Sequence, residues 1–198
     1  MFKKEVIWRE LLYQAIEKRQ FHTTQKELAK LFNFSLSTVF NALKIPRTVG
    51  AVEVSKKGVR VRDSEKFISL WATVRNLKKD IMYQAHSGCS AYEAERLMPN
   101  GVVWTAYSAI RLMTPQKSLP ASYDKVYVYA LPLVVEEIKK RFSKNKHEPN
   151  VYVLKSDSWM KQYGNIATSA QILTDLWNLP EWYATEFYKT YMQEVLAH

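Results

Sequence analysis

The stretch TTQKELAKLFNFSLSTVFNALK, residues 23–44, most constrains how this chain can fold. Apolar residues recur at helical spacing on both sides of Asn33, a residue type that tolerates the left-handed backbone of a tight turn. The pattern therefore predicts two short helices joined at Asn33. Thr23 or Thr24 is expected to cap the first helix, and Glu27 completes a capping box with Thr24.

The second predicted helix has a polar outward face. Ser35 is expected as its N-cap and Pro46 as its limit, because proline removes a helical hydrogen bond. Its buried stripe consists of Val39, Ala42 and Leu43. The residues left outward on one side are Ser37, Thr38, Asn41 and Lys44. None of them is acidic, whereas a merely solvated face usually mixes both signs of charge.

A hairpin is predicted directly after this helix, since alternating runs at 51–54 and 59–62 flank the turn Ser-Lys-Lys-Gly. One more helix is expected before the pair, over about 5–18, and another after the hairpin, over about 65–78. The buried side of the latter should hold Phe67, Ile68, Trp71, Val74 and Leu77. Three helices followed by a hairpin form the winged helix-turn-helix, whose wing brings Lys and Arg to the DNA backbone or minor groove.

The positive charge of the chain is confined to its first part. Residues 1–79 contain 17 Lys or Arg and 7 Asp or Glu, whereas residues 80–198 contain 12 of each, so the first part carries the whole net charge of +10. A basic excess attracts polyanions such as nucleic acids. A solvated basic surface is the alternative, but solubility alone would not require this asymmetry.

Together the paired helices and the hairpin predict a site for double-stranded DNA. Asn41 suits bidentate contact with adenine, and Gln25 and Lys26 begin the first helix of the pair, where phosphate contacts are common. RNA is disfavoured because the aromatic residues of this part fall mainly on helical core stripes. The residues expected to contact DNA are Gln25, Lys26, Ser35, Ser37, Thr38, Asn41, Lys44, Lys56, Lys57, Arg60 and Arg62.

The rest of the chain predicts a second domain of mixed α and β structure, so the whole chain is expected to be α+β. The boundary is placed to give domains 1–79 and 80–198. Helical crossovers between strands favour at least one parallel strand pair. Periodicity does not decide whether 102–113 is a strand leading into a helix. The other expected elements are strands at 81–86, 125–130 and 150–155 and helices at 90–98, 132–142, 168–177 and 181–196.

The segment QKELAKLFNFSLSTVFNAL, residues 25–43, resembles the winged helix-turn-helix of prokaryotic transcription regulators. It departs from that pattern at Asn33, where Gly is usual, and at Leu36, where a polar or basic residue is common. The resemblance implies a sequence-specific DNA-binding transcription regulator that acts as a repressor. The matching positions are Glu27, Leu28, Ala29, Phe32, Phe34, Ser35, Ser37, Thr38 and Val39.

A winged helix followed by an α/β domain is similar in layout to AbiE-type antitoxin regulators of type IV toxin–antitoxin systems. The stretch WTAYSAIRLM and a late segment that matches at Ser169, Ile172, Asp175 and Leu176 carry this resemblance. It implies a repressor of its own operon with a second partner, a separate nucleotidyltransferase-like toxin. The aromatic residues of the last two helices serve as core or as a partner surface. A homodimer is a further option, because paired half-sites multiply specificity.

No catalytic residue, metal site or cofactor motif is found in the sequence. The four histidines lack metal-ligand spacing with each other or with Cys89, and the five glycines form no phosphate-binding loop. Glu93 and Glu95 lie two residues apart on a predicted helix and point to different sides. The alternative interpretation is a nuclease or nucleotidyltransferase-like enzyme delivered to DNA by the winged helix, and it rests only on the α/β character of the second domain.

The expected location is the cytoplasm, with no membrane partner. The first residues, MFKKEVIWRE, lack the apolar run of a signal peptide. No segment approaches the roughly 18 apolar residues of a membrane span. The single cysteine suits a reducing compartment.

Overall fold

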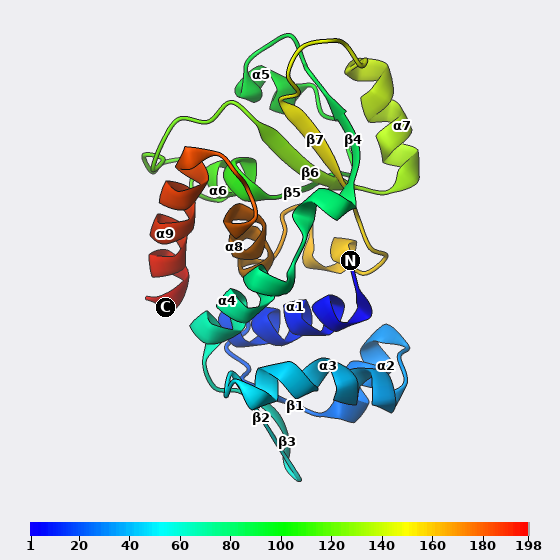
Figure 1. Ribbon diagram of the computed structural model, residues 1–198, viewed down its shortest axis with the longest axis vertical. Helices are drawn as coiled ribbons and strands as arrows, with labels where there is room; N and C mark the ends of the chain where they lie inside the picture. The colour runs from blue at the N-terminus through cyan, green and yellow to red at the C-terminus, as the bar shows by residue number, and fades with distance from the viewer. Residues whose placement is uncertain (198) are drawn as a thin grey trace.

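The computed structural model describes residues 1–197 and has a mixed α+β architecture with two sheets. The three-stranded sheet and its helices form the lower end of the molecule in Figure 1, and the four-stranded sheet forms the upper end. His198, one of the four histidines, lies outside the described residues. None of the helices in residues 1–197 is both long and apolar enough to cross a membrane.

The first part of the chain contains the predicted helices and the predicted hairpin. Its strands pair in the order β1-β3-β2, all antiparallel, and Ser55 pairs with Gly58 across the hairpin turn. The helix α1 packs against both α3 and α4, and α2 packs against α3. The elements are α1 (Lys3–Ile16), β1 (His22–Thr23), α2 (Gln25–Phe32), α3 (Leu36–Thr48), β2 (Val52–Ser55), β3 (Gly58–Val61) and α4 (Ser64–Val74).

The turn between α2 and α3 forms as the sequence predicts. The Thr24 hydroxyl accepts a hydrogen bond from the Glu27 N–H at 3.1 Å, and the Thr24 N–H donates to the Glu27 carboxylate at 2.7 Å. That backbone bond is the main cause that lowers the pKa of Glu27. Asn33 ends α2 in the left-handed conformation, with φ 52°, and Ser35 then caps α3. The capping residues thus fix where α3 begins.

Pro46 does not end α3, which continues to Thr48, so the predicted limit was wrong. A proline inside a helix leaves the carbonyl four residues earlier without its N–H donor. Here that carbonyl belongs to Ala42, and the indole N–H of Trp8 in α1 donates to it at 2.7 Å. A contact between two helices therefore replaces the missing hydrogen bond.

The helix predicted over 65–78 is shorter than expected. Asp63 caps α4, which ends at Val74, and a 3-10 helix follows at Leu77–Asp80. Arg75 continues the chain in an extended conformation, with its guanidinium among buried carboxylates. Val74, which was expected on the buried side, is exposed.

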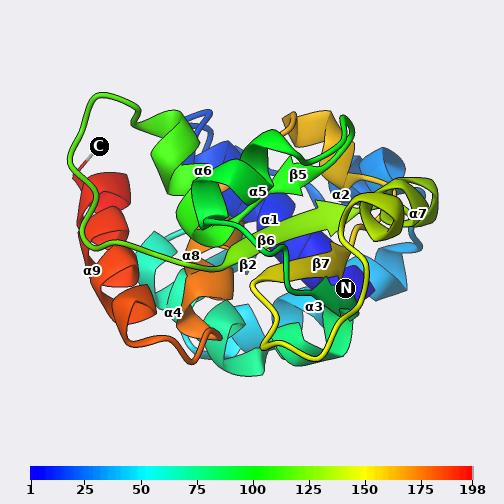
Figure 2. The same ribbon diagram turned by 90° about the horizontal axis from the view of Figure 1, so that it is seen from above.

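The second part is built around a four-stranded sheet of order β4-β7-β6-β5. β6 and β7 are parallel, which confirms the predicted parallel pair, and residues 102–113 form a strand followed by a helix. Figures 1 and 2 place α9 and α7 at opposite sides of this part. The elements are β4 (Ile81–Ala85), α5 (Ala91–Arg96), β5 (Val103–Trp104), α6 (Ala106–Met113), β6 (Val126–Ala130), α7 (Pro132–Arg141), β7 (Val151–Lys155), a 3-10 helix (Met160–Tyr163), α8 (Ser169–Trp177) and α9 (Trp182–Leu196).

The two parts pack together through α1, which contacts α3 on one side and α8 on the other (Figure 1). The Arg9 guanidinium on α1 donates two hydrogen bonds of 2.8 Å to the carboxylate of Asp157, just after β7. Trp159 packs edge-on against Phe32 and Phe34, which flank the turn between α2 and α3. Many contacts therefore cross the division at residue 79, and it stays a prediction that its two sides are separate domains.

A buried charge cluster closes this junction. The Arg75 guanidinium lies within 3.1 Å of the carboxylates of Glu5, Asp80 and Asp175. Burial alone would lower the pKa of Arg75, but electrostatic interactions with Tyr129, Asp175 and Glu5 raise it well above its ordinary value. Arg75 is therefore charged. Its ion pairs connect Glu5 on α1 and Asp175 on α8 with Asp80, at the boundary between the two parts.

Candidate nucleic-acid interface

α1 lies between α3 and the four-stranded sheet of the second part (Figure 1), and the outward side of α3 is the one that does not pack in the core. The opposite side buries Val39, Ala42 and Leu43, as the sequence predicts. Asn41 and Lys44 are both exposed on the outward side, and α3 carries no carboxylate. The polar helix face expected for DNA binding is therefore present in the structure.

Hydroxyl groups gather at the start of α3. The Ser35 hydroxyl accepts a hydrogen bond from the Thr38 N–H at 3.1 Å and lies 2.9 Å from the hydroxyls of both Ser37 and Thr38. These three of the predicted contact residues are thus brought together. The N–H groups at the start of a helix also attract anions, so this cluster suits a phosphate oxygen.

The start of α2 provides a second polar group. Gln25 and Lys26 are the first two residues of α2; Gln25 is half-buried and Lys26 is exposed. Their helix is held against α3 by the turn at Asn33. Lys26 is therefore open to solvent and available to a DNA backbone, whereas Gln25 is partly screened.

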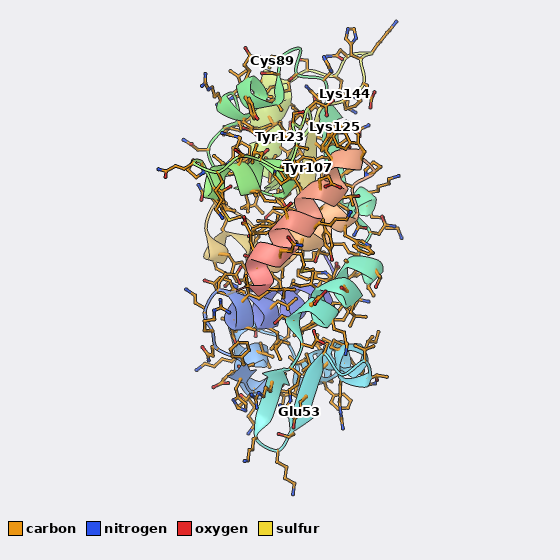
Figure 3. All side chains as sticks on the ribbon, turned by 90° about the vertical axis from the view of Figure 1, so that its left-hand side faces the viewer. Glu53, Cys89, Tyr107, Tyr123, Lys125 and Lys144 are labelled. Atoms are coloured by element: carbon orange, nitrogen blue, oxygen red, sulfur yellow. The ribbon has the colours of Figure 1, made fainter. Side chains whose placement is uncertain are left out.

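The β2–β3 hairpin projects from the same end of the molecule as α3 (Figure 1). Figure 3 shows Glu53 on this hairpin, far from the labelled residues of the second part. Lys56 and Lys57 form the tip and are exposed. Gly58 closes the turn at φ 132°, where a side chain would collide with the carbonyl oxygen of Thr23. Glycine at this position lets the hairpin pack on β1 while its lysines extend outward.

The other two cations of the hairpin lie in β3 and directly after it, and they differ in their surroundings. Arg60 is exposed and pairs across the sheet with His22 and Glu53 in strand register. The Arg62 guanidinium forms an ion pair with the Glu53 carboxylate. One of the four hairpin cations expected to meet DNA is therefore already compensated at the protein surface.

The positive excess of the first part lies at the surface. Two cations of this part, Arg9 and Arg75, are buried, and so are two acids, Glu5 and Glu10. Because these four cancel, the remaining residues of 1–79 still carry the excess of +10. The charge available to a polyanion is thus as large as the sequence indicates.

The sequence interpretation missed the apolar part of this surface. Leu36 and Phe40 are 51% and 50% exposed on α3, beside its polar residues. The signal was present in the sequence, because residues four apart share one side of a helix and the buried side was already filled. Leu36 was interpreted only as a departure from a family pattern.

The carboxylates considered for an enzyme are engaged by protein donors. Glu93 accepts a hydrogen bond from the Ser90 N–H at 2.9 Å as part of a helix cap, and it is exposed. Glu95 is buried and contacts Arg111 and the Tyr123 hydroxyl. The two glutamates thus point to different sides, as predicted. Within residues 1–197, His, Cys, Asp and Glu side chains form no group of three or more arranged for a metal ion.

A cavity of about 560 Å³ lies on the second part beside the start of α9. The Lys125 ammonium lies 3.1 Å from the Glu181 carboxylate and 3.3 Å from that of Glu148. His86 Nδ1 is 2.8 Å from the carbonyl oxygen of Glu148, and Cys89 lines the same cavity. One lysine thus faces two glutamates here, and because Asp124 also lines the cavity, its charged side chains leave an excess of negative charge.

Comparisons with known proteins identify no relative of this chain. No family model matches the chain, and neither the comparison with curated proteins nor that with solved structures gives a match. The function is therefore inferred from the geometry described above.

Proposed function

We propose that this protein is a sequence-specific, double-stranded DNA-binding transcription regulator of the winged helix-turn-helix type that acts as a repressor. In this proposal α3 enters the major groove, and the β2–β3 hairpin lies against the backbone or minor groove. The observation that carries it is the exposure, at one end of the molecule, of a carboxylate-free helix face beside a cationic hairpin. The major groove of DNA is wide enough for an α-helix, and short polar side chains on that helix can contact the base edges.

The order of elements supports the winged type. Residues 3–61 run helix, strand, helix, helix and hairpin, and the early strand β1 completes a sheet with the hairpin. This arrangement anchors the hairpin beside α3, so that one approach to DNA engages both. The exposed lysines at the hairpin tip then neutralise phosphates, while Asn41 on α3 meets a base edge.

The test is the salt dependence of duplex binding by the full-length protein. Affinity should fall steeply with salt, since each neutralised phosphate contributes about −0.9 to the log–log slope. Lys56→Gln together with Lys57→Gln should reduce the magnitude of that slope by about 2. The matched control is Lys139→Gln with Lys140→Gln on α7, which should leave the slope unchanged. No duplex binding near physiological salt, or equal effects of the two variants, would contradict the proposal.

A protein-binding role for the second part is proposed from the resemblance to antitoxin regulators. Trp182 at the start of α9 is 72% exposed, and Trp177 at the end of α8 is also exposed. Exposed aromatic residues often concentrate the binding energy of protein interfaces. Co-expression with a nucleotidyltransferase-like protein encoded by a neighbouring gene should relieve its toxicity, and Trp182→Ala should weaken that relief more than Leu133→Ala on α7. Unrelieved toxicity would remove this role and leave DNA binding standing.

A further inference from the structure

An apolar stripe runs along the outward side of α3. Leu36 and Phe40 lie one helical turn apart and are each about half exposed. One turn further on, the ammonium of Lys44 lies 5.4 Å from the centroid of the Phe40 ring. The stripe borders the buried side of α3, since the buried Leu43 lies seven residues after Leu36, yet about half of Leu36 and of Phe40 stays open to solvent. The stripe is therefore a surface feature of the helix.

A polar stripe lies directly beside the apolar one. Ser37 and Asn41 follow Leu36 and Phe40 by one residue each, and both are exposed. Because an α-helix turns by about 100° per residue, the two stripes are neighbours on the outward side. A DNA groove that receives this side of α3 therefore contacts the Asn41 amide together with the apolar side chains of Leu36 and Phe40.

We propose that Leu36 and Phe40 contact the 5-methyl groups of thymine, so that the preferred DNA site is rich in A·T pairs. Thymine presents a methyl group in the major groove, and adenine presents the donor and acceptor that match an Asn side chain. A run of A·T pairs therefore satisfies both stripes at once. The inference rests on the proposed function, since α3 must lie in the major groove.

The surroundings of the stripe favour DNA over a protein partner. Lysine is depleted from protein interfaces, yet Lys44 continues this stripe. Arg47, also exposed, lies on the same side of α3 and adds a second cation. Both cations suit the phosphates that border the major groove. A protein interface built on this stripe would have to desolvate them.

The experiment begins with the full-length protein and a random-sequence duplex library, from which the preferred site is selected. Thymine in the selected site is then replaced by uracil, one position at a time, which removes the methyl group and keeps the hydrogen-bonding edge. We expect affinity to fall about fourfold at each contacted thymine, since burying one such carbon contributes about 0.8 kcal/mol. Positions outside the contacted pairs should be insensitive to the replacement.

Variants assign the effect to the stripe. Leu36→Ala and Phe40→Ala should each remove the thymine-over-uracil preference at one position of the site. Ile45→Ala is the matched control, because Ile45 is exposed on α3 but lies outside the stripe. It should keep the full thymine preference.

The outcomes separate this inference from the proposed function. Failure of the library to yield a bound sequence would overturn the proposed function and the inference with it. Selective binding with equal affinity for the thymine and uracil duplexes would overturn the inference alone. A change in oligomeric state in Phe40→Ala, with an unchanged thymine preference, would assign the stripe to a protein contact instead. Loss of preference in Ile45→Ala equal to that in Phe40→Ala would also overturn it.

Discussion

The proposed DNA-binding end and the junction between the two parts differ in how their cations are placed: exposed at the first, and buried among carboxylates at the second. At the DNA-binding end, Lys44, Lys56 and Lys57 are exposed and, among residues 1–197, form no ion pair. At the junction, Arg75 is buried among three carboxylates. A buried charge without a partner costs several kcal/mol, whereas an exposed cation keeps its hydration until it meets a polyanion. Under the proposed function, cations of the same kind thus bind DNA in one region and hold the two parts of the molecule together in the other.

Substitution at the junction should have the largest effect. Arg75→Met keeps a long, unbranched side chain but removes the guanidinium that pairs with the carboxylates of Glu5 and Asp175. The free energy of unfolding should fall by about 3–5 kcal/mol, measured by urea-induced unfolding of the full-length protein. In Arg62→Met, which breaks an exposed pair with Glu53, the loss should stay below about 1 kcal/mol. Similar losses in both variants would break the comparison.

Trp8→Phe tests the support that α1 gives to α3. The variant removes the indole N–H that donates to the Ala42 carbonyl. The usual helical donor to this carbonyl is missing, because residue 46 is a proline and has no N–H. An unsatisfied buried carbonyl should lower the free energy of unfolding by about 1–3 kcal/mol. Trp177→Phe, at an exposed tryptophan, should leave stability unchanged in the same measurement. An unaffected Trp8→Phe protein would show that α3 is held by packing alone.

Asn41→Ala and Lys57→Ala compare the two kinds of contact within the proposed DNA-binding end, to a base edge and to the phosphate backbone. Loss of a bidentate base contact should remove about 1–3 kcal/mol of discrimination at one base pair, measured by competition between matched and single-mismatch duplexes. Lys57→Ala should instead weaken binding to every duplex alike and lower the salt slope by about 1. If Lys57→Ala changed the sequence preference and Asn41→Ala did not, the reading helix would be misplaced.

The features that could be predicted from the sequence depend on residues close together in the chain. The Thr24–Glu27 box spans three residues, and Asn33 turns the chain by its own backbone preference. Alternation of apolar and polar residues was sufficient for the hairpin, and the helix between two predicted strands was sufficient for the parallel pair. The polar outward side of α3 likewise followed from helical spacing.

The predictions that were wrong depend on distant partners. α3 continues past Pro46 because Trp8, 34 residues before Ala42, supplies a donor. α4 ends early where Arg75 turns to Asp175, which lies 100 residues later. No local pattern contains either partner. The exposure of Leu36 and Phe40 was missed for a different reason, since only the polar residues of the outward side were considered as contacts.

The pairing of Arg9 with Asp157 joins residues that lie 148 positions apart. During synthesis α1 is complete long before its partner exists, and the loop that this pair closes contains most of the chain. Closing a long loop costs conformational entropy, and folds that depend on such contacts form slowly. The contact between α1 and the second part is therefore completed only after residue 157 has been made.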